Sequence, residues 1–186
     1  MNNFFDEDYF ERGLVTGKSC YMNYRWMPEL TIPMAMTMID FLGIKRGQTV
    51  LDFGCAKGYL VKAFRMLGRD AYGVDCSEYA LKNCHPDVKH FCYRNTFCLN
   101  SFDYCIAKDV FEHVPVDELN KILNQIQSAI MFVVVPLGEL GCYRIPAYHA
   151  DPSHLIVEAE DWWMGLFETN GWVVEDFRCR VPGIKD

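Results

Sequence analysis

The feature that most constrains this chain is a short loop with a glycine at each end, placed between an apolar strand and a helix. Residues 49–53 are Thr-Val-Leu-Asp-Phe, which is typical of a buried strand. The loop runs from Gly54 to Gly58, and residues 59–67 then show helical spacing before Gly68 ends them. Glycine lets the backbone turn sharply and approach a ligand closely. The segment therefore predicts an α/β fold with a ligand site at this loop.

Strands and helices alternate through most of the chain. We predict further strands at residues 71–74, 88–93, 104–107, 130–135 and 172–177, and helices at residues 28–42, 77–84, 117–129 and 160–170. Such alternation is typical of a mostly parallel sheet with helices on both faces. The strand at 130–135 is apolar throughout, which predicts that both of its faces are covered. Ligands of these sheets bind beyond the carboxyl ends of the strands.

A carboxylate at the end of the second strand limits which class of ligand the site can bind. Asp75 lies 21 residues after the first glycine of the loop, Gly54, where a carboxylate can accept hydrogen bonds from both hydroxyls of a ribose. A dinucleotide site has Gly-x-Gly-x-x-Gly and places a helix N-terminus on a pyrophosphate. Here the pattern is Gly-x-Ala-x-Gly, and an acid, Asp52, precedes it. An acid opposes a pyrophosphate but suits sulfonium and ammonium groups, so the sequence favours a sulfonium cofactor over a dinucleotide.

Three segments in this order resemble motifs of the class I S-adenosylmethionine-dependent methyltransferases. Val-Leu-Asp-Phe-Gly-Cys-Ala-Lys-Gly at residues 50–58 and Gly-Val-Asp-Cys-Ser at residues 73–77 resemble the first two motifs. Phe-Asp-Tyr at residues 102–104, followed by Asp-Val-Phe-Glu-His-Val at residues 109–114, resembles the fourth-strand segment with its Glu-His-Val. The resemblance covers residues 49–136 and extends loosely to the end. It implies a Rossmann-like, doubly wound, mostly parallel sheet of six to seven strands with helices on both faces.

The whole chain, residues 1–186, is predicted to be a single methyltransferase domain. Its predicted parts are an N-terminal lid and helical segment (1–45), a cofactor-binding core (46–136), a substrate-facing loop (137–158) and a C-terminal helix and strand (159–186). The net charge of -7 would repel a phosphate backbone. No Asn/Asp-Pro-Pro-Tyr/Phe motif follows the fourth strand either. Both observations disfavour nucleic acid as a partner.

Nine cysteines without a Cys-x-x-Cys pair exclude a zinc knuckle and a thioredoxin-type redox site. Many unpaired cysteines suit a reducing cytoplasm. The first ten residues lack the features of a signal peptide, and no apolar stretch is long enough to cross a bilayer. We therefore expect a cytoplasmic protein with no membrane partner and no metal ligands, and the sequence is compatible with a homo-oligomer.

Carried onto this sequence, the resemblance implies a set of contacts to S-adenosylmethionine. Asp75 would hold the ribose, Cys76 would lie beside the adenine, and Lys108 would contact the cofactor through its backbone. Lys57 departs from the family pattern, and could either pair with the cofactor carboxylate or be an exposed lysine at a helix start. The predicted cofactor-binding residues are Asp52, Gly54, Cys55, Ala56, Lys57, Gly58, Asp75, Cys76, Asn95, Thr96, Lys108, Tyr24 and Arg25.

Tyr24 and Arg25 belong to an aromatic N-terminal stretch that could fold over the site as a lid. Arginine binds carboxylates in a bidentate fork, so Arg25 could hold the carboxylate of the cofactor. The alternative is that the stretch is a structural aromatic cluster packed against the sheet.

The candidate catalytic residues are His113, Glu112, Asp109 and His154. If a helical turn follows the fourth strand, Asp109, Glu112 and His113 share one face of it. Similar patterns occur in ubiquinone-pathway O-methyltransferases, where they can bind a divalent metal, and in some N-methyltransferases, where they supply a base. Elsewhere the Glu and His are structural. His154 follows a turn and could be a base or a loop anchor.

These observations predict methyl transfer to a small-molecule acceptor, with a hydroxyl as the reacting group. A quinone-type phenol and a sugar both fit. Two alternatives stay open: a non-catalytic partner subunit that binds S-adenosylmethionine, and a nicotinamide-dependent oxidoreductase, which the glycine spacing disfavours.

Overall fold

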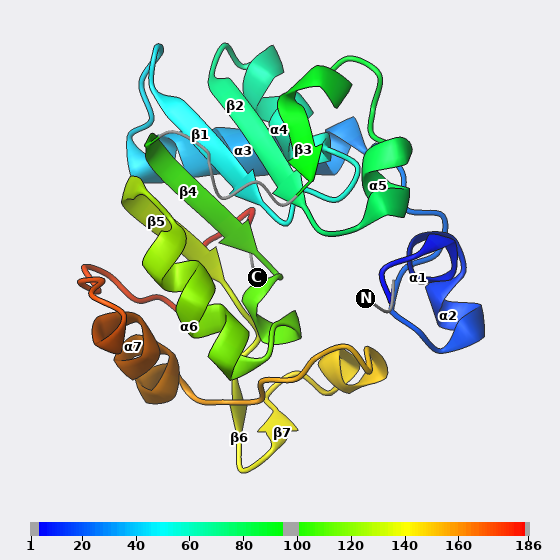
Figure 1. Cartoon of the computed structure of the whole chain (residues 1–186), viewed down its shortest axis with the longest axis vertical. Coiled ribbons are helices and arrows are strands. Elements are labelled where there is room, and N and C mark those ends of the chain that lie inside the picture. Colours follow the sequence, from blue (N-terminus) through cyan, green and yellow to red (C-terminus); the bar gives the residue numbers. More distant parts are fainter. Residues whose placement is uncertain (1–3, 95–100, 185–186) are drawn as a thin grey trace.

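The computed structural model describes residues 4–94 and 101–184. A five-stranded parallel sheet with the order β3-β2-β1-β4-β5 forms its centre (Figure 1). The strands are β1 (Thr49–Phe53), β2 (Asp70–Asp75), β3 (Cys92–Arg94), β4 (Phe102–Lys108) and β5 (Ser128–Val134). The strand order reverses between β1 and β4, so the carboxyl ends of these two strands open the crevice in which α/β sheets bind ligands. The predicted parallel α/β fold is confirmed.

Helices cover both faces of the sheet (Figure 1). The longer helices are α3 (Pro28–Leu42) and α4 (Tyr59–Met66) on one face, and α6 (Val116–Gln125) and α7 (Glu160–Thr169) on the other. Successive residues of a strand point to opposite faces. Accordingly Ile106 packs in the cluster that contains Phe64 of α4, whereas Ala107 packs with Leu119 of α6 and Trp163 of α7. Among the described residues, no helix is long and apolar enough to cross a membrane.

The N-terminal segment, residues 4–27, lies beyond the carboxyl ends of the strands and beside α5 (Glu78–Lys82) (Figure 1). It contains two short helices, α1 (Glu7–Glu11) and α2 (Gly13–Thr16). The hydroxyl of Ser77, at the start of α5, donates to the Phe5 carbonyl at 2.5 Å, and the Phe10 ring stacks on Tyr79 with centroids 6.1 Å apart. These contacts hold the segment against the end of β2.

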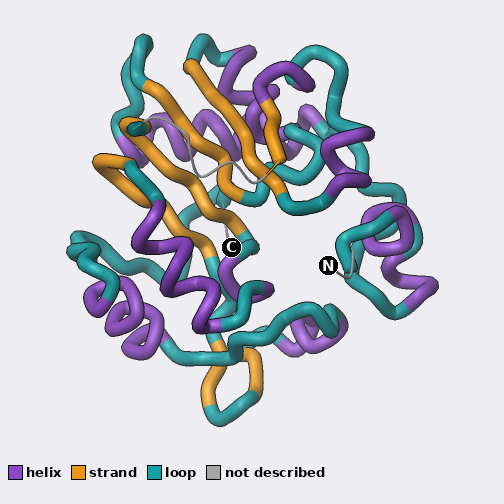
Figure 2. The backbone as a smooth tube through the Cα atoms, viewed as in Figure 1, coloured by secondary structure: helices purple, strands orange, loops and turns teal. Residues whose placement is uncertain are grey.

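The sheet has five strands rather than the predicted six to seven. Residues 172–177, predicted as a strand, run as a loop after α7 (Figure 2). The Trp172 ring N–H donates to the Leu123 carbonyl at 3.2 Å, and its backbone N–H donates to Phe167, so the segment is held to the helices instead of the sheet. Within the described chain β5 is thus an edge strand, and Ile130 is 38% exposed, contrary to the expectation that both its faces are covered.

Two other segments differ from the sequence prediction. The predicted strand at 88–93 begins as a 3-10 turn, Lys89–Phe91, and only Cys92–Arg94 pairs with β2. The predicted loop at 137–158 contains a hairpin of β6 (Gly138–Glu139) and β7 (Cys142–Tyr143), followed by the 3-10 turn Pro146–Ala150.

Candidate active site

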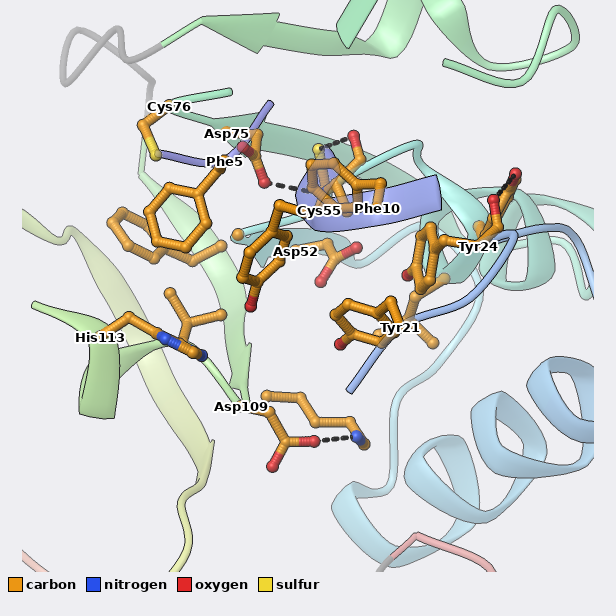
Figure 3. A pocket seen from close by; sticks show the side chains of 18 of the residues that line it. Phe5, Phe10, Tyr21, Tyr24, Asp52, Cys55, Asp75, Cys76, Asp109 and His113 are labelled. Carbon is orange, nitrogen blue, oxygen red and sulfur yellow. Dashed lines mark hydrogen bonds and ion pairs between the residues drawn. The ribbon is translucent and has the colours of Figure 1, made fainter. Parts of the chain in front are cut away.

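A cavity of about 980 Å³ lies at the carboxyl ends of the central strands, and the N-terminal segment lines part of its wall. Figure 3 shows Phe5 and His113 on one side of the cavity and Tyr21 and Tyr24 on the other. Of the predicted site residues, the following line it: Tyr24, Arg25, Asp52, Gly54, Cys55, Ala56, Asp75, Cys76, Lys108, Asp109 and His113. Lys57, Gly58, Glu112 and His154 are not among its lining residues. Asn95 and Thr96 lie outside the described residues.

The loop after β1 is held to β2 by Asp75. One carboxylate oxygen of Asp75 accepts the Ala56 N–H at 2.7 Å, and the other accepts the Ser77 N–H at 2.7 Å (Figure 3 shows the first bond). Gly54 must be glycine, because an added Cβ would meet a methyl group of Val110 at 2.3 Å, and its φ of 81° lies in the left-handed region. Sequence and fold together therefore set the loop backbone before any ligand binds.

Asp52 gives the cavity its electrostatic character. Its side chain is buried, and burial together with the nearby Asp75 raises its pKa to about 7, against the opposing charge of Lys108. A cationic ligand would relieve the two neighbouring carboxylates, whereas a pyrophosphate would add to their repulsion. The donor set therefore fits a cofactor with a sulfonium and an ammonium group, as the sequence predicted.

Lys57 connects the N-terminal segment to the cofactor loop. Its side chain is buried, and its ammonium forms an ion pair with Glu11 and donates to the Tyr24 carbonyl at 2.8 Å. The ammonium also lies over the rings of Tyr24 and Tyr79 at 5.9 and 5.8 Å from their centroids. Both sequence interpretations of Lys57 are therefore replaced, since it is neither an exposed lysine nor directed at the cavity.

Three further cofactor candidates have distinct surroundings. The Tyr24 ring lines the cavity and stacks on Tyr59, with centroids 5.3 Å apart. Arg25 lines the cavity and is exposed, and it forms no ion pair with any residue in 4–94 or 101–184. Gly58 packs away from the cavity, because a Cβ there would meet the sulfurs of Cys84 and Cys92, each at 2.9 Å.

The acceptor side is formed by the turn after β4. Asp109 has a φ of 53° and pairs with Lys108, so the chain is not helical at this residue. The 3-10 turn begins later, at Phe111–His113. The predicted helical face of Asp109, Glu112 and His113 is therefore wrong: Asp109 and His113 line the cavity, while Glu112 is buried behind them.

Three of the predicted catalytic residues still lie close together. One possible metal-ligand atom from each of Glu112, His113 and His154 lies within 4.8 Å of the others. The centroids of the two histidine rings are 4.6 Å apart. Two imidazoles and a carboxylate are a donor set that could hold a divalent transition metal. The same side chains could equally act on a proton.

His113 joins a hydrogen-bonded chain that reaches the N-terminal segment. Its Nδ1 is 2.8 Å from the Ser153 hydroxyl, which donates to Asp151, and the Tyr9 hydroxyl donates to the other oxygen of Asp151 at 3.1 Å. Burial and the neighbouring His154 lower the pKa of His113 to about 4, although Asp151 opposes this shift. The imidazole is therefore neutral at physiological pH.

The sequence predicted an N-terminal lid over residues 1–45, but not which of its first residues reach the cavity. Phe5, Tyr9 and Phe10 line the cavity, yet no role was predicted for them. The available signal was the density of aromatic residues in the first ten positions. Conversely, no residue of 137–158, predicted to face the substrate, is among the lining residues; this loop contacts the lining residues His113, Tyr9 and Cys20 from behind.

Taken together, the sheet order, the glycine loop and the carboxylate after β2 define a class I S-adenosylmethionine-dependent methyltransferase fold. Residues 29–176 match the family model described as a methyltransferase domain, and the chain belongs to this family. S-adenosylmethionine is accordingly its cofactor.

Curated relatives and solved structures agree with the family. The chain is 26% identical over 165 residues to the ribosomal protein L11 methyltransferase of Haemophilus ducreyi, covering 83% of this chain and 51% of that protein. It thus spans about half the length of the curated relatives that it matches. Its fold is similar to a SAM-dependent methyltransferase from Archaeoglobus fulgidus (TM-score 0.58, 17% identity, 77% of this chain and 71% of that chain). It is also similar to the YcgJ protein of Bacillus subtilis (TM-score 0.57, 17% identity, 74% and 67%).

Proposed function

We propose that this protein transfers the methyl group of S-adenosylmethionine to a hydroxyl of a small molecule. The observation that carries the proposal is one cavity with two unlike sides, the Asp52–Asp75 carboxylates on one and the neutral His113 on the other. Its volume of about 980 Å³ is at the upper end of the range for small-molecule sites, so a second ligand fits beside the cofactor.

The cofactor side would use the residues that line the loop end of the cavity. The backbone of Gly54, Cys55 and Ala56 would face the methionine and ribose, and Asp75 would accept the ribose hydroxyls. Cys76 and the backbone of Lys108 would complete the contacts. Asp52 would face the cationic groups, and Tyr24 and Arg25 would hold the carboxylate. The bound cofactor supplies a methyl group activated by its positive sulfur.

The acceptor side favours a flat, weakly acidic hydroxyl compound. The rings of Phe5, Tyr9 and Tyr21 line the cavity, Phe5 against His113 and Tyr21 against Tyr9, and would hold an aromatic ring by its faces and edges. Transfer requires the acceptor oxygen in line with the methyl group, and the hydroxyl proton must leave. His113 would accept that proton. Glu112 and His154 would support the His113 ring, and Asp109 would orient the hydroxyl.

Two other functions compete with this one. The curated relatives include methyltransferases of a ribosomal protein, which favours a protein acceptor. The N-terminal segment lines part of the cavity wall and narrows the access to it, and this favours a small molecule instead. The second alternative is a partner subunit that binds the cofactor without catalysis; it requires that no acceptor be methylated.

One set of measurements separates these possibilities. Calorimetric titration with S-adenosylhomocysteine and with NAD, on wild-type protein and Asp75→Ala, tests the cofactor site. Formation of S-adenosylhomocysteine is then assayed with a panel of phenols, a panel of sugars and purified ribosomal protein L11, each with and without EDTA. Turnover of a phenol or sugar supports the proposal, and we expect it to survive EDTA. Turnover of the ribosomal protein alone would replace the small-molecule acceptor, and cofactor binding with no turnover would favour the non-catalytic subunit.

A further inference from the structure

We propose that Tyr9, Asp151 and Ser153 are positioning residues that keep the proton of His113 on Nδ1 and leave its Nε2 as the proton acceptor at the cavity wall. The catalytic part rests on the function proposed above. The tautomer itself is a property of the protein alone, so it can be tested without an acceptor.

The hydrogen bonds fix the direction of each donor. Asp151 receives three: the Tyr9 hydroxyl at 3.1 Å, the Ser153 N–H at 2.9 Å, and the Ser153 hydroxyl. A carboxylate only accepts, so the single hydroxyl proton of Ser153 is used toward Asp151. The Ser153 oxygen, 2.8 Å from Nδ1 of His113, can then only accept. Nδ1 must therefore carry the proton, and a neutral imidazole then has its lone pair on Nε2.

The chain of bonds is buried, which makes its directions hard to reverse. Tyr9 is 4% exposed, Asp151 6% and Ser153 9%. Burial raises the pKa of Tyr9, so its hydroxyl keeps the proton that it donates. A buried polar group that loses its partner is costly, because water cannot replace the missing bond. Each of the three side chains therefore holds the next in one orientation.

Ring contacts fix the orientation of the His113 ring that the hydrogen bond to Ser153 also holds. The Phe5 ring meets it edge to face with centroids 5.8 Å apart, and the His154 ring lies 4.6 Å away on the loop side. The Nδ1 of His154 is itself 2.9 Å from the Tyr148 carbonyl. His113 thus has the cavity on one side and the loop of residues 151–154 on the other.

This arrangement accounts for the charge in the transfer step. The acceptor O–H bond breaks and its proton moves to Nε2, while the oxygen–carbon bond forms and the carbon–sulfur bond breaks. The positive charge that leaves the sulfur ends on the imidazolium, and the proton passes to water afterwards. The carboxylates that face His113 are Asp109, Glu112 and Asp151, and the neighbouring cationic candidate is His154. Through Ser153, Asp151 stabilises the imidazolium as it forms.

The tautomer is measured by long-range ¹H–¹⁵N NMR on ¹⁵N-labelled protein, with His113→Gln used to assign the ring signals. We expect the Nδ1–H form in wild-type protein and in Asp151→Asn, because an amide oxygen still accepts the Ser153 hydroxyl. In Ser153→Ala we expect a shift toward the Nε2–H form, and Ser153→Thr should restore Nδ1–H. Asp151→Asn should lower the pKa of His113 in a pH titration, because the carboxylate charge that raises it is removed. Tyr9→Phe should leave the tautomer unchanged and raise that pKa slightly, because Asp151 loses a hydrogen-bond donor.

The overturning results are equally specific. An Nε2–H tautomer in the wild-type protein, or a Ser153→Ala spectrum identical to it, would refute the proposal. So would zinc at equimolar concentration shifting the His113 and His154 signals together, since Nε2 would then be a metal ligand. Thr169→Ala removes a hydroxyl that bonds only its own helix, at Gly165, and serves as the control.

Kinetics with catechol as the probe acceptor give the second readout. Ser153→Ala and Asp151→Asn should lower kcat roughly tenfold or more with little change in the KM for S-adenosylmethionine. An equal loss of kcat and cofactor affinity would indicate a merely structural role and refute the positioning. If no acceptor in the panels is methylated by wild-type protein, the proposed function fails, while the NMR result still decides the tautomer.

Discussion

The two sides of the cavity are built in different ways. Most of the cofactor side comes from one continuous stretch, residues 49–77, in which a strand, a loop, a helix and a second strand place the groups locally; Lys108, Tyr24 and Arg25 come from elsewhere. The acceptor side brings together residues 5–21, the turn at 109–113 and, behind it, residues 151–154. Site residues that are close in the sequence can be predicted from a motif, whereas site residues that only packing brings together cannot. The two sides should therefore respond differently to substitution.

The sharpest contrast is expected at His113. His113→Gln should lower kcat for the hydroxyl acceptor by roughly 10²–10⁴-fold, the usual contribution of a general base, and should leave the affinity for S-adenosylhomocysteine unchanged. Initial rates and calorimetry measure the two quantities. His90→Gln, at an exposed histidine in the turn before β3, is the matched control. A parallel loss of cofactor affinity would show that the two sides are not separable.

The opposite pattern is expected at Asp75. Asp75→Ala removes the proposed ribose acceptor and also frees the Ala56 and Ser77 N–H groups, so the affinity for S-adenosylhomocysteine should fall on the order of a hundredfold. Asp70→Ala, at the exposed start of the same strand, should have no effect. Calorimetry that gave both variants wild-type affinity would remove Asp75 from the site.

Glu11 tests the junction between the two sides. Glu11→Ala leaves the Lys57 ammonium with the Tyr24 carbonyl as its remaining hydrogen-bond partner, and should lower the free energy of unfolding by about 2 kcal/mol. It should weaken both cofactor and acceptor binding, unlike either substitution above. Urea denaturation is the measurement, with Glu7→Ala as an exposed control on the same helix. Unchanged stability would mean that the ion pair does not hold the N-terminal segment.

The smallest effect concerns Asp52 and pH. Its pKa of about 7 should fall when a cationic ligand binds, so binding at pH 6 should release a proton. Affinity for S-adenosylmethionine should then rise several-fold between pH 6 and pH 8 and level off above that range. Asp75 and Lys108 are the charged groups that act on Asp52, so Asp52→Asn should remove the dependence if it belongs to this residue. Titrations in buffers of different ionisation enthalpy count the protons.

The features that the sequence predicted correctly are the locally determined ones, and those that it missed depend on long-range packing. The strand at Thr49–Phe53, the glycine loop and Asp75 were predicted at their observed positions, because local geometry alone requires them. The hydrogen bond from Tyr9 to Asp151 joins residues 142 positions apart, and no periodicity signals such a contact. The prediction of a strand at 172–177 was wrong for a related reason. The apolar residues of this segment are typical of a strand, but Trp172 donates hydrogen bonds to the carbonyls of Leu123 and Phe167.

The position of Lys57 also has a consequence for the order of events in time. Glu11 and the Tyr24 carbonyl both belong to the N-terminal segment, while Lys57 lies in the loop of residues 54–58 that the cofactor would touch. The N-terminal segment cannot move away without breaking the contacts of Lys57 with Glu11 and with the Tyr24 carbonyl. A ligand that stabilises the loop would therefore also stabilise these contacts. We therefore expect the cofactor to bind before the acceptor and the demethylated cofactor to leave last.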